Sequence, residues 1–114
     1  MLVLLDKNVP YPVRGFLLHH TVRTAAELGW DRLTNGDVLN AGEAEGFDVM
    51  VTADQSLSYQ QNLMNRTIAL VFLGTNRLSL LEAEPERIVL AVDAATAGSY
   101  RFVKYELPPK PKRD

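Results

Sequence analysis

Two short stretches of the chain are apolar and then stop at an aspartate: Leu2-Val3-Leu4-Leu5-Asp6 and Val49-Met50-Val51-Thr52-Ala53-Asp54. An unbroken apolar run of this length is typical of a strand buried on both faces, as in a parallel sheet covered by helices. In such sheets, ligands bind beyond the carboxyl ends of the strands. Two acids that converge there repel each other unless a cation lies between them. The pattern therefore predicts a divalent metal site at one edge of a sheet.

Strands and helices are predicted to alternate along the chain. Further strands are expected at 21–24, 67–73 and 100–105, where apolar or alternating residues lie between turn-forming residues. Helices are expected at 13–18, with Pro12 in the first turn, at 35–46, capped by Asn35, and from Pro85 to near Gly98. This alternation predicts an α/β fold with a mainly parallel sheet of about five strands and helices on both faces.

The composition is that of one globular domain. The chain has 114 residues, of which 46% are hydrophobic and 23% charged, and we expect one domain over 1–106 followed by a flexible tail at 107–114, rich in proline and lysine. The lack of cysteine excludes disulfides, thiolate zinc sites and a thiol nucleophile. A net charge of -2 provides no overall positive field for nucleic acid. Because no run of about 18 apolar residues occurs, we expect no membrane span. The lack of cysteine fits a cytoplasmic location, which we expect.

Three aspartates at the ends of predicted elements are the candidate catalytic residues and metal ligands: Asp6, Asp37 and Asp54. Hard cations such as Mg²⁺ prefer oxygen ligands and keep several bound waters, so that two or three carboxylates are enough to hold one. A metal-bound water is more acidic than bulk water and can attack a phosphodiester, while the cation offsets the charge that develops on the phosphate. Such a site needs no protein nucleophile.

Each aspartate also has a purely structural explanation. Asp37 stabilises the N-terminus of its helix through its charge. Asp6 can accept hydrogen bonds from turn amides before Pro10, and Asp54 can cap a turn that follows it. Taken singly, these explanations are the simpler ones. Taken together, they do not explain why two buried strands stop at one edge on the same residue type.

Several segments of the chain carry a family pattern: residues 4–10 (LLDKNVP), 23–30 (RTAAELGW), 35–37 (NGD), 46–54 (GFDVMVTAD) and 59–63 (YQQNL). In these segments, the chain resembles the small stand-alone PIN-like proteins of bacteria, relatives of the VapC-type ribonuclease toxins. The resemblance implies a PIN-like three-layer α/β/α fold and a Mg²⁺- or Mn²⁺-dependent endoribonuclease. It places Asp6, Asp37 and Asp54 at the family's acidic positions. It also implies that the enzyme is the toxin of a type II toxin–antitoxin pair, with RNA as substrate, a small antitoxin encoded nearby as partner, and a homodimer as one oligomeric state.

Two positions depart from the family pattern. Many relatives have a glutamate directly after the first aspartate, where this chain has Lys7, and a further acid two positions after the last aspartate, where it has Ser56. Three acids then replace the usual four, which leaves a catalytically decayed PIN-like binding module as an alternative. Contacts to single-stranded RNA are expected from polar residues near the aspartates: Asn8, Arg14, Thr52, Gln55, Ser56, Tyr59 and Gln60.

A receiver-like phosphoacceptor domain is the second functional class. Asp54 after one strand, Thr75 after the next and Lys104 in the last match the spacing of such signalling domains. Receivers, however, usually carry paired acids after the first strand, and here Asp6 is followed by Lys7.

His19-His20 contains two potential metal ligands. No acid or histidine accompanies the pair at a characteristic spacing, so that the sequence favours a turn or surface role.

Overall fold

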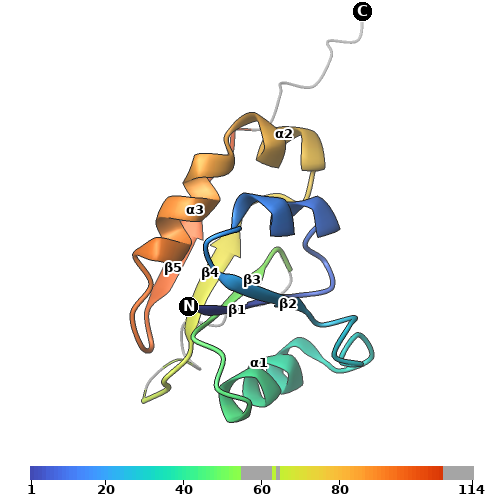
Figure 1. Cartoon of the computed structure of the whole chain (residues 1–114), viewed down its shortest axis with the longest axis vertical. Coiled ribbons are helices and arrows are strands. Elements are labelled where there is room, and N and C mark those ends of the chain that lie inside the picture. Colours follow the sequence, from blue (N-terminus) through green and yellow to red (C-terminus); the bar gives the residue numbers. More distant parts are fainter. Residues whose placement is uncertain (55–62, 64, 107–114) are drawn as a thin grey trace, which may run out of the picture.

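The computed structural model describes residues 1–54, 63 and 65–106, and its centre is a five-stranded sheet in which all paired strands are parallel. The order in the sheet is β2-β1-β3-β4-β5 (Figure 1). The predicted strands are thus present, and the sheet is wholly rather than mainly parallel. The strands are β1 (Leu2–Leu5), β2 (Thr21–Thr24), β3 (Val49–Thr52), β4 (Ala69–Leu73) and β5 (Tyr100–Val103).

Four helical elements are described between these strands: the 3₁₀ helix η1 (Tyr11–Phe16), α1 (Asn35–Ala44), α2 (Leu78–Ala83) and α3 (Pro85–Asp93). As expected, proline stands in the first turn of η1 and of α3, where its missing N–H costs no helical hydrogen bond. Within the described ranges, no helix has the length and apolar character that a membrane span needs.

The helices differ from the sequence predictions in four details. The first one is a 3₁₀ helix over Tyr11–Phe16 rather than a helix over 13–18. Thr34 rather than Asn35 caps α1, because its hydroxyl accepts the N–H of Asp37 at 3.3 Å. The short helix α2 is not predicted by the sequence pattern. The last helix ends at Asp93, and the chain is already in a turn when it reaches Gly98, whose φ of +73° is of the kind that favours glycine.

Apolar layers cover both faces of the sheet because alternate residues of each strand point to opposite sides. Val3, Leu5 and Val51 pack in the apolar layer of η1, α2 and α3, whereas Leu4 and Met50 pack in the layer of α1. Figure 1 shows α1 apart from α2 and α3, with the sheet between them. Strands β3 and β4 are buried along their whole length. Their unbroken apolar runs are therefore those of central strands in a covered parallel sheet.

The connection between β4 and β5 has the opposite hand to the one between β1 and β2. The chain moves one place toward one edge of the sheet from β1 to β2, and one place toward the other edge from β4 to β5. Helices α2 and α3 nevertheless contact η1 and share its apolar layer. Connections between parallel strands of one sheet are nearly always right-handed. Because these two connections have opposite hands, one of them is left-handed.

Candidate active site

Asp6 lies at the carboxyl edge of the sheet, between the ends of β1 and β3. Its N–H donates to the carbonyl of Val51 at 2.9 Å, and only 2% of the residue is exposed. The carboxylate accepts three hydrogen bonds: Oδ1 from the N–H of Lys7 (2.8 Å), and Oδ2 from the Thr52 hydroxyl (2.8 Å) and the Asn8 amide (3.4 Å). These bonds fix the orientation of the carboxylate and compensate for its removal from water.

The sequence predicts contacts to RNA from Thr52 and Asn8. In the structure, both side chains donate hydrogen bonds to the carboxylate of Asp6. The Asn8 Oδ1 atom accepts the N–H of Ala53 at 2.8 Å, which ties the loop after β1 to the end of β3. The buried Thr52 Oγ1 accepts the N–H of Asp54 at 3.3 Å while it donates to Asp6. One threonine hydroxyl therefore contacts both aspartates that end the apolar runs, at the carboxylate of Asp6 and at the backbone N–H of Asp54.

Asp37 is exposed in the first turn of α1, as the sequence predicts. The carboxylates of Asp6, Asp37 and Asp54 do not form a tight cluster. In the described part of the chain, the group of three potential ligand atoms from histidines or acids that lie within 4.8 Å of one another is that of His19, His20 and Asp93. Direct ligands of Mg²⁺, at about 2.0–2.1 Å, lie no more than about 4.2 Å apart. At most two of the three aspartates could therefore be direct ligands of one such ion in this arrangement.

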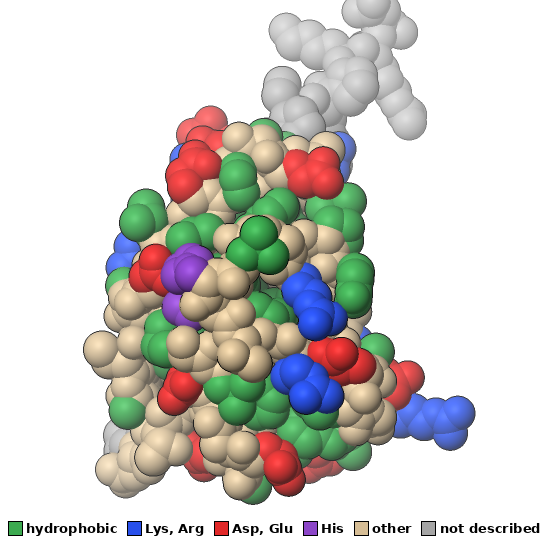
Figure 2. All heavy atoms as spheres, in the orientation of Figure 1, with side chains coloured by type: hydrophobic (Ala, Val, Ile, Leu, Met, Phe, Trp, Pro, Cys, Tyr) green, Lys and Arg blue, Asp and Glu red, His purple; other side chains and the backbone are tan. Residues whose placement is uncertain are grey.

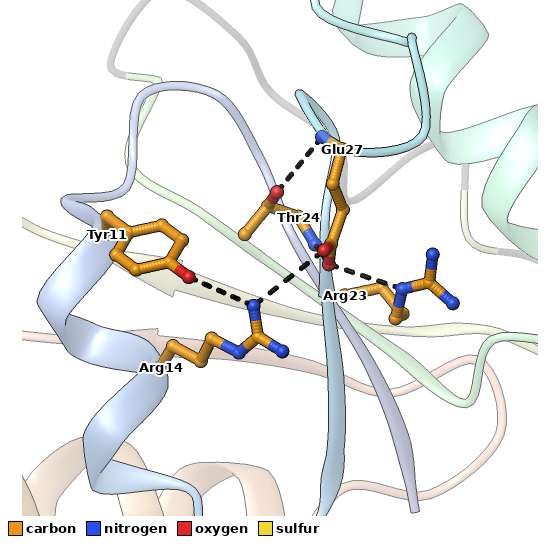
Figure 3. Close-up of polar contacts among 5 residues, drawn as sticks. All are labelled: Tyr11, Arg14, Arg23, Thr24 and Glu27. Carbon is orange, nitrogen blue, oxygen red and sulfur yellow. Dashed lines mark hydrogen bonds and ion pairs between the residues drawn. The ribbon is translucent and has the colours of Figure 1, made fainter.

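A pocket of about 270 Å³ opens beside Asp6. Tyr11, at the start of η1, lines this pocket and is 66% exposed. Its hydroxyl accepts a hydrogen bond from Arg14 at 3.1 Å, and the guanidinium lies 5.8 Å from the ring centroid (Figure 3). The pocket is lined by Asp6, Lys7, Val9, Pro10, Tyr11, Thr24 and Ala26.

Glu27 connects this region to β2 (Figure 3). Its carboxylate pairs with Arg14 (3.7 Å) and Arg23 (3.2 Å) and accepts the N–H of Thr24 at 2.6 Å, while the Thr24 hydroxyl accepts the N–H of Glu27 at 3.1 Å. The Thr24 N–H lowers the pKa of Glu27 most. Desolvation opposes it, and the guanidiniums of Arg14 and Arg23 add to the lowering, so that the pKa lies below its usual value. The T-x-x-E spacing of a capping box is the sequence signal for this pair.

Four residues proposed for RNA contacts, Gln55, Ser56, Tyr59 and Gln60, lie outside the described residues, as does the predicted tail at 107–114. Comparison of the chain with models of protein families, with curated proteins and with solved structures gives no match.

Proposed function

We propose that the protein is a PIN-like endoribonuclease that depends on Mg²⁺ or Mn²⁺, with Asp6 as its central metal ligand. The observation that carries this proposal is the buried Asp6 carboxylate, which Thr52 and Asn8 hold at the carboxyl edge of the sheet beside a pocket. Ligands of parallel α/β sheets bind at this edge. The resemblance of the surrounding segments to PIN-like proteins supplies the reaction class.

The donor atoms around Asp6 suit a hard cation. The neighbouring side-chain acceptors are oxygens of Thr52 and Asn8, the ligand type that Mg²⁺ and Mn²⁺ prefer. A carboxylate oxygen can accept in two directions, and the described structure gives Oδ1 of Asp6 one hydrogen bond, from Lys7. Oδ1 thus retains a position for an ion, which when bound supplies an acidic water and offsets charge on the phosphate.

The remaining roles follow from position and chemistry. Asp6 would hold the ion directly, and Asp37 and Asp54 would act on it through bound water. The exposed ring of Tyr11 offers a stacking surface to a base of single-stranded RNA, and Arg14 beside it offers a guanidinium to a phosphate. A small antitoxin encoded nearby is the proposed protein partner and would act by covering this edge.

Cleavage of a labelled single-stranded RNA by the purified protein tests the proposal. We expect weak cleavage with Mg²⁺ or Mn²⁺, none in chelator, and loss of activity in Asp6→Asn and Asp54→Asn. Asp48→Asn is the matched control, because Asp48 also accepts a backbone N–H, from Leu2 at 2.8 Å, but lies before β3 at the amino edge of the sheet. Cleavage that persists in chelator, or in Asp6→Asn, contradicts the proposal.

A pair of variants at Thr52 separates the orientation of Asp6 from its charge. Thr52→Val keeps the shape but removes the hydroxyl that donates to Asp6, and Thr52→Ser keeps the hydroxyl. Hydrogen bonds to charged groups contribute about 1.5–3 kcal/mol, so that Thr52→Val should lower the free energy of unfolding by that amount. It should also weaken Mn²⁺ binding roughly 10–100-fold, as loss of other outer-shell partners does. Equal Mn²⁺ affinity in both variants would mean that Thr52 does not orient Asp6.

A receiver-like domain is the second candidate, because the order β2-β1-β3-β4-β5 is also found in that class. Thr75 follows β4 and Lys104 follows β5, as in receivers. If all connections were right-handed, however, the helices between β4 and β5 would lie on the face of α1, whereas α2 and α3 pack with η1. Incubation with a small phosphodonor and Mg²⁺, followed by intact-mass analysis, should give no adduct. A single phosphoryl adduct that is lost in Asp54→Asn would favour the receiver.

A further inference from the structure

Two consecutive histidines and one aspartate from a distant part of the chain come together at the amino edge of the sheet. His19 and His20 directly precede β2, and Asp93 is the last residue of α3. The Nε2 atoms of His19 and His20 lie 2.9 and 2.6 Å from the same atom, Oδ1 of Asp93. Figure 2 shows the two imidazoles, in purple, side by side at the surface.

The three side chains offer the donor set of a zinc site. Two imidazole nitrogens and one carboxylate oxygen are a common protein ligand set for Zn²⁺, which leaves a fourth position for water. One ligand atom from each residue lies within 4.8 Å of the other two. Around a tetrahedral Zn²⁺ with bonds of about 2.0–2.2 Å, ligand atoms are about 3.3–3.6 Å apart. Each imidazole therefore needs to move away from Asp93 by no more than about 1 Å to admit an ion.

The surroundings hold one ligand in place and leave the others accessible. The side chain of His20 is only 7% exposed, and its Nδ1 lies 3.0 Å from the nitrogen of Met1. The side chains of His19 and Asp93 are 53% and 43% exposed, so that an ion can reach them from solvent. A simple hydrogen bond between α3 and the segment before β2 requires one imidazole. Two imidazoles directed at the same carboxylate oxygen are more than such a link needs.

We propose that His19, His20 and Asp93 bind one Zn²⁺ ion, which ties the end of α3 to the segment that precedes β2. The site lies at the opposite edge of the sheet from Asp6, and its nitrogen ligands suit Zn²⁺ rather than Mg²⁺. The role of this ion is to stabilise the fold, and it does not depend on the ribonuclease proposal.

Zinc titration of the full chain, purified without a histidine tag and treated with chelator, tests the site. We expect one Zn²⁺ per chain in calorimetry and a higher melting temperature. Because the chain has only two histidines, NMR of the imidazole protons reports each ligand directly, and both sets of signals should shift. Substitution of the half-exposed residues, His19→Gln and Asp93→Asn, should weaken zinc binding at least about tenfold, the loss seen even for outer-shell partners.

Asp6→Asn is the control for this experiment. This variant should bind Zn²⁺ with the affinity of the wild type but should no longer cleave RNA with Mg²⁺ or Mn²⁺. The zinc proposal and the ribonuclease proposal can therefore fail independently. Imidazole signals that do not move with Zn²⁺, or a zinc affinity that is unchanged in both His19→Gln and Asp93→Asn, would overturn the proposal.

Discussion

At the scale of single residues, buried polar groups differ in how they are satisfied. The carboxylate of Asp6 accepts hydrogen bonds from three donors, and the buried Thr75 Oγ1 accepts the N–H of Arg77 at 3.1 Å. In contrast, the Tyr105 hydroxyl is the one buried side-chain polar atom without a hydrogen-bond partner in the described part of the chain. Its burial raises the pKa of Tyr105 to about 12, against an opposing effect of the Arg87 guanidinium.

Tyr105→Phe should therefore stabilise the protein. A hydroxyl that is removed from water without a partner costs about 1–3 kcal/mol, and its removal should raise the free energy of unfolding by up to about that amount. Urea denaturation measures the change. Tyr11→Phe is the control, because that hydroxyl is exposed and accepts a bond from Arg14, so that its loss should not stabilise. A clear loss of stability in Tyr105→Phe would show that the hydroxyl has a partner, such as a bound water.

At the scale of elements, α1 packs closely on the sheet because a glycine faces it. A Cβ atom at Gly42 would lie 2.8 Å from the Leu4 Cδ2 and 3.4 Å from the Ile68 Cδ1. Gly36, in the first turn of the same helix, has no atom of a neighbouring group within 4 Å of such a Cβ. The two glycines thus differ in packing while they share a helix.

Alanine substitutions at these two glycines should have opposite effects. Alanine favours a helix over glycine by about 1 kcal/mol, so that Gly36→Ala should stabilise by up to that amount. Gly42→Ala gains the same propensity but crowds the apolar layer, which typically costs about 1–3 kcal/mol, so that it should destabilise. Thermal or urea unfolding of both variants gives the comparison. Equal effects would mean that α1 can shift on the sheet without cost.

The sequence predicts those elements whose signal is local. The unbroken apolar runs of β1 and β3 predict both strands, whereas the hydrogen bonds of Thr52 to Asp6 and Asp54 are seen only in the structure. The sequence does not reveal α2, because its six residues are too few for a helical period to stand out. It also cannot show that Asp93 meets His19 and His20, because this contact depends on how α3 crosses the sheet next to η1. That the carboxylates of Asp6, Asp37 and Asp54 do not form one tight group is likewise a matter of tertiary packing.

At the scale of the whole molecule, two glutamates tie together segments that are distant in the sequence. Glu43 of α1 accepts the N–H groups of Thr67 (2.9 Å) and Ile68 (3.4 Å) before β4 and pairs with Arg66. Desolvation raises the pKa of Glu43, but these N–H groups and the Arg66 guanidinium outweigh it and hold the pKa below its usual value of 4.5. Glu27 plays the corresponding part between η1 and β2.

These two glutamates should make the fold sensitive to acid. A carboxylate whose pKa is lower in the folded than in the unfolded chain contributes stability above the unfolded value, near 4.5, and loses it as the pH falls through the lower folded value. Urea unfolding at a series of pH values should show this decline, with a shallower slope below pH 4.5 in Glu43→Gln and Glu27→Gln. Glu45→Gln, at an exposed position just after α1, is the control variant. A wild-type slope in Glu43→Gln would mean that the pairing also persists in the unfolded chain.

The place of β1 between β2 and β3 also has a consequence during synthesis on the ribosome. Of the five strands of this sheet, β1 comes first in the chain and is an inner strand, and its neighbour β3 is made much later, since Asp6 and Thr52 are 46 positions apart. At roughly 5–20 residues per second, that interval lasts about 2–9 s. Throughout it, the nascent chain exposes an apolar strand with an unpaired edge, which can recruit other chains. During this interval, β1 is therefore a segment that a chaperone should protect.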